Sequence, residues 1–242
     1  MKENVDKAKL EDRCLIEPAI DVAKSLQKHK WEDELWKKVV ERFKKHGRGP
    51  KDAKGKFDIA HTKASVAWAK ILGNLENRSD SEIEILTVVM MLHDTGYDFL
   101  HREGFVKYGD EIDLKSKHIH SEESVVLANI WRKEIKGLKD LTDTEWGTAI
   151  ELIRDHDDKR IFEQDNYTRG DGYHDLMPLV FAADTLGQID VRSGVIPSFE
   201  GDNLRNYLDK QLQRRGDILQ GDHARKVFSV LKEIIIEKYL KT

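Results

Sequence analysis

The spacing of apolar residues constrains the fold more than any other feature of this sequence. Apolar side chains recur every three or four residues over most of the 242-residue chain, and no stretch alternates apolar and polar residues as a half-buried strand would. Only four prolines interrupt the pattern. We therefore expect an all-α protein, a compact multi-helix bundle, with helices near residues 16–29, 31–46, 57–72, 81–94, 119–136, 143–157, 176–190, 202–214 and 222–240.

Local signals refine this organisation. Ser81 with Glu84, and Thr142 with Glu145, have the spacing of a helix N-terminal capping box. A Gly- and Lys-rich stretch, HGRGPKDAKGK, follows the first predicted helices and reads as a loop. No internal repeat is evident. We expect a helical N-terminal extension packed on a larger helical core, with the boundaries 1–55 and 56–242.

Composition excludes several classes of protein. The formal net charge is −4, whereas domains that coat nucleic acid usually carry a basic excess. The single cysteine, Cys14, cannot form an internal disulfide or a Cys-rich zinc site. No apolar run approaches the roughly 18 residues of a membrane span, and the charged N-terminus lacks the apolar segment of a signal peptide. We expect a cytoplasmic protein that is not bound to a membrane.

Several predicted helices carry a lone polar residue on an otherwise apolar face. A single inward histidine is more often a hydrogen-bonded core residue than a ligand, but buried carboxylates are rare without a partner. A metal centre explains all of these residues together, and its mixed nitrogen and oxygen ligands suit Mn²⁺, Fe²⁺, Co²⁺, Ni²⁺ or Zn²⁺ better than Ca²⁺. The candidate ligands are His61, His93, Asp94, His120, His156 and Asp184.

Three segments resemble the HD superfamily of metal-dependent phosphohydrolases: FDIAHTKASVAWA, MLHDTGY and FAADTLG. They place His61, the pair His93-Asp94 and Asp184 in the order of that superfamily, over about residues 57–190. The resemblance implies that residues 56–242 form an HD-domain core with C-terminal helices, and that these four residues bind a metal.

Two further histidines make the pattern similar to the six-ligand version of the superfamily. That version occurs in cyclic-dinucleotide phosphodiesterases of the HD-GYP type and in di-iron oxygenases related to myo-inositol oxygenase. The resemblance then implies two divalent transition metals per chain, with Mg²⁺ also admissible. Asp94 would bridge from the first metal to a second one held by His120 and His156.

The sequence departs from this pattern at Tyr97. Many two-metal relatives read His-Asp-x-Gly-Lys, where the lysine approaches the substrate, and the Gly-Tyr-Pro signature of the HD-GYP group is also missing. Tyr97 either donates a hydrogen bond in place of that lysine or packs against a neighbour.

We expect a hydrolase that cleaves a phosphoester or phosphoanhydride bond in a nucleotide or another small phosphorylated metabolite, using a metal-activated water. The candidate catalytic residues are Asp94, Tyr97 and Lys159. Two alternatives are an oxygen-activating di-iron enzyme and a non-catalytic nucleotide sensor, and the sequence leaves the oligomeric state open. The candidate phosphate contacts are Lys117, Lys159, Arg102 and Arg192.

Overall fold

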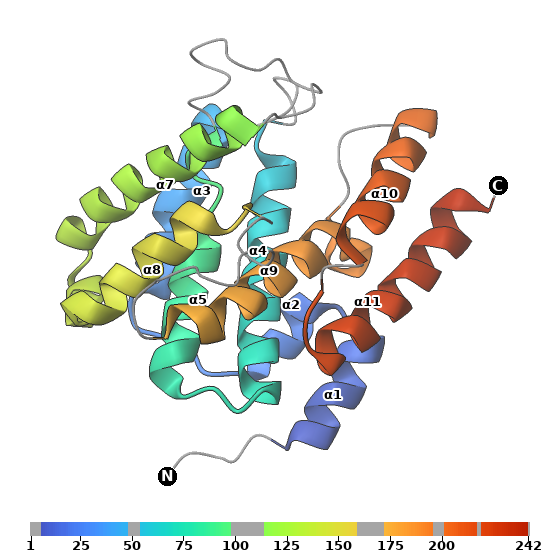
Figure 1. The fold of residues 1–242 in the computed structure, drawn as a ribbon, viewed down its shortest axis with the longest axis horizontal. Coiled ribbons are helices and arrows are strands. Elements are labelled where there is room, and N and C mark those ends of the chain that lie inside the picture. Colours follow the sequence, from blue (N-terminus) through green and yellow to red (C-terminus); the bar gives the residue numbers. More distant parts are fainter. Residues whose placement is uncertain are drawn as a thin grey trace.

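The computed structural model describes residues 6–47, 54–97, 114–158, 172–195, 201–216 and 219–241. This part of the chain contains helices and no strand, so the all-α prediction is confirmed (Figure 1). The α-helices are α1 (Lys7–Ile16), α2 (Ala19–Val22), α3 (Glu32–His46), α4 (Lys56–Leu75), α5 (Asp80–Leu92), α7 (Leu114–Glu134), α8 (Asp143–Asp155), α9 (Tyr173–Ile189), α10 (Gly201–Arg215) and α11 (Asp222–Ile235). Shorter helical turns are η1 (Ala23–Ser25), η2 (Lys136–Asp140), η4 (Val191–Ser193) and η6 (Ile236–Leu240).

Helix α4 lies at the centre of the bundle and packs against both α5 and α9 (Figure 1). Helix α9 approaches α4 closely because the α9 residue at this contact is a glycine, Gly187. A Cβ atom at Gly187 would lie only 2.8 Å from the backbone nitrogen of Ser65. The two backbones therefore approach each other near the middle of the molecule, where polar residues of both helices meet.

The N-terminal segment packs directly on α4. Helices α1, α2 and α3 each contact α4, and their apolar side chains belong to the same continuous core as those of the later helices. The buried ammonium of Lys70 on α4 donates to both carboxylate oxygens of Glu32, at 2.6 and 2.7 Å, and to the carbonyl of Gln27 at 3.1 Å. The boundary at residue 55 stays a prediction, because a shared core does not test it.

Two local predictions are wrong. The predicted helix over 16–29 is only the short α2 and η1, and α1, which lies before it, was not predicted. Pro18 has no N–H group, so it separates α1 from α2. The capping box of α5 is formed by Ser79 and Glu82, two residues before the predicted pair. The capping box formed by Thr142 and Glu145 at the start of α8 is confirmed.

The central helices contain an internal repeat, contrary to the sequence-based expectation. Helix α4 has 20 residues and α7 has 21, and each carries a buried histidine within its first two turns. From that histidine onward both helices read His-(Thr/Ser)-x-x-Ser-Val-x-x-Ala-x-Ile, beginning at His61 and at His120. The positions match one to one over three turns of helix.

The helices that follow them repeat as well. Helices α5 and α8 have 13 residues each, and each begins with a capping box. Each ends at a histidine in the C-cap position, His93 or His156, followed directly by an aspartate. The bundle thus contains two equivalent helix pairs, α4–α5 and α7–α8, and each pair supplies two buried histidines.

Candidate metal centre

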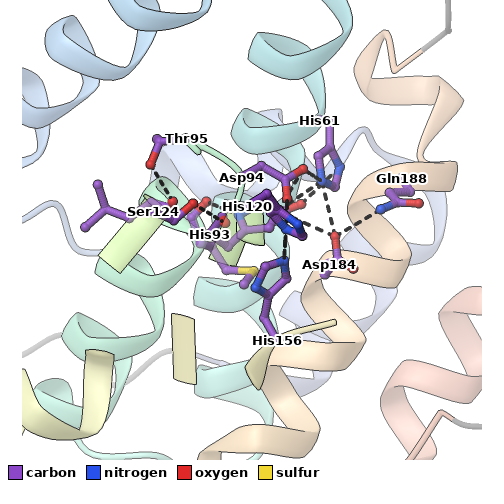
Figure 2. A network of polar contacts seen from close by, with 12 residues as sticks. His61, His93, Asp94, Thr95, His120, Ser124, His156, Asp184 and Gln188 are labelled. Atoms are coloured by element: carbon purple, nitrogen blue, oxygen red, sulfur yellow. Dashed lines mark hydrogen bonds and ion pairs between the residues drawn. The ribbon is translucent and has the colours of Figure 1, made fainter. Parts of the chain in front are cut away.

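The histidines at the ends of α5 and α8 are oriented by their own helices. Nδ1 of His93 lies 2.9 Å from the carbonyl oxygen of Met90, and Nδ1 of His156 lies 2.7 Å from that of Ile153. A carbonyl only accepts hydrogen bonds, so Nδ1 carries the proton in both rings. The lone pair is then on Nε2, which is the atom that each ring directs toward the centre of the bundle (Figure 2).

The first group of ligand atoms lies between α4, α5 and α9. Nε2 of His61 and Nε2 of His93 are 3.1 Å apart. Asp94 Oδ2 lies 3.5 Å and 3.6 Å from these two nitrogens, and Asp184 Oδ1 lies 3.2 Å and 3.5 Å from them. Three helices thus bring two imidazole nitrogens and two carboxylate oxygens to one point.

The second group uses the other oxygen of the same aspartate. Nε2 of His120 and Nε2 of His156 are 3.4 Å apart. Asp94 Oδ1 lies 3.7 Å from the former nitrogen and 3.5 Å from the latter. Asp94 therefore stands between the two groups, with Oδ2 facing one histidine pair and Oδ1 facing the other (Figure 2).

These distances match the requirements of metal coordination. Two ligand atoms about 2.1 Å from one ion are about 3.0 Å apart at a right angle and about 3.4 Å apart at the tetrahedral angle. Within each group the spacings run from 3.1 to 3.7 Å, so they overlap this range and exceed its upper end by about 0.3 Å at most. Two buried groups that share Asp94 could therefore hold metal ions.

Burial and charge both shape the protonation of these histidines. All six candidate ligand side chains are at most 4% exposed. Burial lowers the pKa of His61, but the carboxylates of Asp184 and then Asp94 outweigh it and raise that pKa to about 9. Burial also opposes protonation of His156, yet Asp94 raises its pKa above the usual value. In the absence of metal, a proton on His61 balances the buried carboxylates below about pH 9, and a metal cation would replace it.

The turn that carries Asp94 is fixed against α7. The backbone N–H of Gly96 donates to Ser124 Oγ at 2.9 Å, and that hydroxyl donates to the carbonyl of His93 at 2.8 Å. A Cβ atom at Gly96 would lie 2.7 Å from the Ser124 nitrogen, so only glycine allows this approach. The contact brings the turn of the first helix pair onto the helix that carries His120.

A serine and a glycine also pack together beside His61, in the first group. Ser65 Oγ lies 3.4 Å from Nδ1 of His61, and the neighbouring glycine of α9, Gly187, packs on this serine. Gly187 is three residues after Asp184, so the close contact sets the position of that carboxylate. Ser65 and Ser124 thus each lie four residues after a candidate histidine ligand, and a glycine packs on each of them. Gly187, on Ser65, follows Asp184, and Gly96, on Ser124, follows Asp94.

Sequence reasoning missed these supporting residues. The shared His-x-x-x-Ser spacing of α4 and α7 is a signal that could have identified Ser65 and Ser124. Tyr173 also supports the site: its hydroxyl donates to Asp155 Oδ2 at 2.9 Å, and Asp155 directly precedes His156. No sequence signal predicts that contact, because it depends on how α8 meets α9.

The other predicted site residues are placed as follows. The ring of Tyr97 is buried and stacks on that of His120, with centroids 4.0 Å apart and planes 13° apart. The guanidinium of Arg192 donates to the carbonyls of Leu15 and Cys14, at 2.9 and 3.2 Å, and so ties η4 to the end of α1. Lys117 lies in α7, but its side chain is outside the described structure, and Arg102 and Lys159 lie outside the described residues. The phosphate contacts predicted for Lys117, Lys159, Arg102 and Arg192 stay predictions.

The chain was compared with family models, with curated proteins and with solved structures, and none of the three comparisons gave a match. Within the described residues, no helix has the length and apolar character needed to cross a membrane.

Proposed function

We propose that this chain is a metal-dependent hydrolase of the HD type, which cleaves a phosphoester or phosphoanhydride bond in a nucleotide or another small phosphorylated metabolite. One observation carries the proposal. Asp94 places Oδ2 3.5 Å from Nε2 of His61 and Oδ1 3.5 Å from Nε2 of His156. A carboxylate shared in this way suits two divalent cations about 3.5–4 Å apart, which is the arrangement of many enzymes that act on phosphate esters.

The charge of the site favours an anionic substrate. With neutral imidazoles, Asp94 and Asp184 bring two negative charges, whereas two divalent cations bring four positive charges. The loaded centre would therefore carry a surplus of about two positive charges in a buried place. A phosphoryl group and a deprotonated water compensate that surplus, which a neutral substrate does not.

When bound, the two ions would activate a water for attack on phosphorus and stabilise charge on the phosphoryl oxygens. The chain's own residues keep the ligands in place. The carbonyls of Met90 and Ile153 hold the rings of His93 and His156 with Nε2 toward the centre. Tyr97 covers one face of the His120 ring and excludes water from it.

Phosphate binding needs further cationic side chains in this proposal, because Tyr97 stands where many two-metal relatives have a lysine. Lys117 precedes His120 by three residues, and Lys159 follows His156 by three. We assign phosphate contact to these two lysines, which are close in sequence to the ligands of the second group.

The test begins with elemental analysis of freshly purified protein. The metal-free protein is then reloaded with Mn²⁺, Co²⁺, Ni²⁺ or Mg²⁺ and assayed for phosphate or pyrophosphate release from a panel of nucleotides and phosphoesters. His156→Ala should lose the activity, whereas His223→Ala, at a partly exposed histidine that faces Glu11, should retain it.

The alternative is a di-iron oxygenase, because four histidines and two aspartates are also suitable ligands for iron. Anaerobic loading with Fe²⁺ followed by measurement of oxygen consumption distinguishes the two functions. Oxygen consumption without any release of phosphate or pyrophosphate from the panel would overturn the hydrolase.

A further inference from the structure

Residues 26–30, between η1 and α3, lie against α4 and α5 and enclose a small polar cavity with them. Gln27 and His29 of this segment line the cavity together with Lys70 of α4 and Asp80 of α5. The volume of the cavity is about 20 Å³, which is enough for about one water molecule. A charged group that faces this cavity therefore cannot recruit a full hydration shell while the segment is closed.

The imidazole of His29 is buried at this cavity with one nitrogen unpartnered. Its side chain is 7% exposed, and its ring stacks on that of Trp31, with centroids 5.5 Å apart. Nδ1 lies 3.5 Å from Glu84 Oε1, whereas Nε2 is buried and has no hydrogen-bond partner in the part of the chain that the structure describes. A neutral ring can keep Nε2 as an acceptor for a single water, but an imidazolium would bring a second N–H donor and a charge into this place.

The charged groups that face the ring come from all three helices packed around it. They are Glu32 of α3, Lys70 of α4, and Asp80 and Glu84 of α5. Burial lowers the pKa of His29, and it outweighs the carboxylates of Glu84 and Glu32, which raise that pKa, while the Lys70 ammonium adds to the lowering. The lysines on either side of His29 are exposed to solvent. The buried ring is therefore neutral at pH 7.

The 26–30 segment lies mostly at the surface, so it can open without unfolding of the helices beneath it. Leu26 is 9% exposed, whereas three of the other four residues are exposed. The next residue, Trp31, is 3% exposed, and its indole N–H donates to Glu84 Oε1 at 2.6 Å, which fixes the start of α3. Opening of the segment would expose the His29 ring and one buried apolar side chain, a local change of the kind that mobile surface segments undergo.

We propose that His29 makes the attachment of this segment sensitive to pH, such that protonation of its ring releases residues 26–30 from α4 and α5. In the closed state an imidazolium would lie near the Lys70 ammonium with room for about one water. In the open state bulk water solvates the charged ring, so acidification favours opening. None of the residues involved is a candidate metal ligand, and the proposal is therefore independent of the proposed hydrolase.

Linkage between protonation and opening gives the pH range. A histidine whose pKa is lowered in the closed state contributes stability that is complete above its ordinary pKa of about 6.5, and this stability declines as the pH falls below that value. Between pH 6.5 and the lowered pKa, the ratio of closed to open segment should fall by up to about tenfold per pH unit. The ordinary pKa of a glutamate is about 4.3, so measurements between about pH 7.5 and 5.5 report mainly on histidine.

Hydrogen exchange followed by mass spectrometry measures the opening, after correction for the pH dependence of the chemical exchange rate. In the wild-type chain, the protection of residues 26–30 should be constant from about pH 7.5 to 6.5 and should fall from 6.5 to 5.5. His29→Gln should remove this pH dependence, because glutamine does not titrate. His223→Gln is the matched control at a partly exposed histidine beside Glu11, and it should keep the wild-type response of residues 26–30.

Titration of the histidine rings by NMR tests the same group directly and does not depend on how well His29→Gln closes the segment. The His29 signal, identified by its loss in His29→Gln, should report a pKa below 6.5. Glu84→Gln should lower this pKa further, because it removes a carboxylate that favours the charged ring, while glutamine can still accept the Trp31 indole hydrogen.

Three results would overturn the proposal and leave the proposed hydrolase intact. The first is protection of residues 26–30 that does not change with pH in the wild-type chain, and the second is a pH dependence that persists in His29→Gln. The third is a His29 pKa at or above 6.5, since protonation would then stabilise the closed segment or leave it unaffected.

Discussion

At the scale of single residues, Asp94 is the link between the two halves of the centre, because each of its oxygens faces a different histidine pair. Asp94→Ala should therefore remove a ligand from both groups and abolish bound metal. His120→Ala and His156→Ala should each lower the metal content from about two per chain to about one. Elemental analysis measures this, and circular dichroism checks that the helices remain. Full metal occupancy in Asp94→Ala would contradict the assignment.

The protonation of His61 predicts how the metal-free protein responds to pH. Its pKa is raised from 6.5 to about 9 in the fold, so its protonation stabilises the metal-free form fully below about pH 6.5. That stabilisation is lost as the pH rises through about 9. Metal binding at pH 7.5 should release this proton, because a ligand nitrogen must be deprotonated.

Calorimetric titration with metal in buffers of different ionisation enthalpy measures that release. The melting temperature of the metal-free protein should fall between about pH 6.5 and 9 by more than that of the loaded protein. Metal binding without proton release at pH 7.5 would show that His61 is already neutral.

Lys159 offers a test of substrate binding that is separate from metal binding. A charge-assisted hydrogen bond to phosphate contributes about 1.5–3 kcal/mol, so Lys159→Ala should lower kcat/KM roughly tenfold or more. The metal content should stay that of the wild type. Unchanged kinetics would remove this lysine from the site without affecting the proposed hydrolysis.

At the scale of helices, the glycine of α9 controls how closely α9 approaches α4. Gly187→Ala would place a Cβ atom 2.8 Å from the Ser65 nitrogen, and this backbone atom cannot move away alone. The variant should lose about 1–3 kcal/mol of stability and bind the metal of the first group more weakly, because Asp184 moves with the helix. Denaturant unfolding and metal titration measure the two effects.

Helix α8 provides the matched control. A Cβ atom at Gly147 would meet nothing within 4 Å, and alanine favours a helix interior over glycine by roughly 0.5–1 kcal/mol. Gly147→Ala should therefore be neutral or slightly stabilising. Equal losses in the two variants would refute the close-packing argument.

The same scale shows what could be predicted from sequence. Periodicity located α4, α5 and α8 well, because their buried faces are regular, and it placed all six candidate ligands on inward faces. It failed around Pro18, where it missed α1 and predicted too long a helix in place of α2 and η1, and at the start of α5, where Ser79 and Ser81 offer two overlapping capping boxes. The repeat was missed because the outer-face residues of α4 and α7 differ and obscure the matched inner positions.

The sequence could not predict which oxygen of Asp94 faces which histidine pair. The orientation of the Asp94 carboxylate between the two pairs depends on a tertiary contact, in which the turn at Gly96 lies against Ser124. The contact of Gly187 with Ser65 is of the same kind. Such contacts join segments far apart in the chain, and spacing within one helix does not reveal them.

At the scale of the whole molecule, the two helix pairs have different surroundings. The first is enclosed by the N-terminal segment, through the buried pair of Lys70 and Glu32 among other contacts. The second meets the same segment through ion pairs between α3 and α7, in which Lys38 lies 2.7 Å from Glu134 and Arg42 lies 3.9 Å from Glu123.

The position of the ligands along the chain also has a consequence for biosynthesis. His61 and Asp184 are separated by more than a hundred residues, yet their side-chain atoms lie 3.2 Å apart. During synthesis, the first group is incomplete until α9 has left the ribosome and packed on α4. Metal uptake by the complete first group therefore follows folding of the central bundle, and a truncated chain that ends before α9 would lack Asp184.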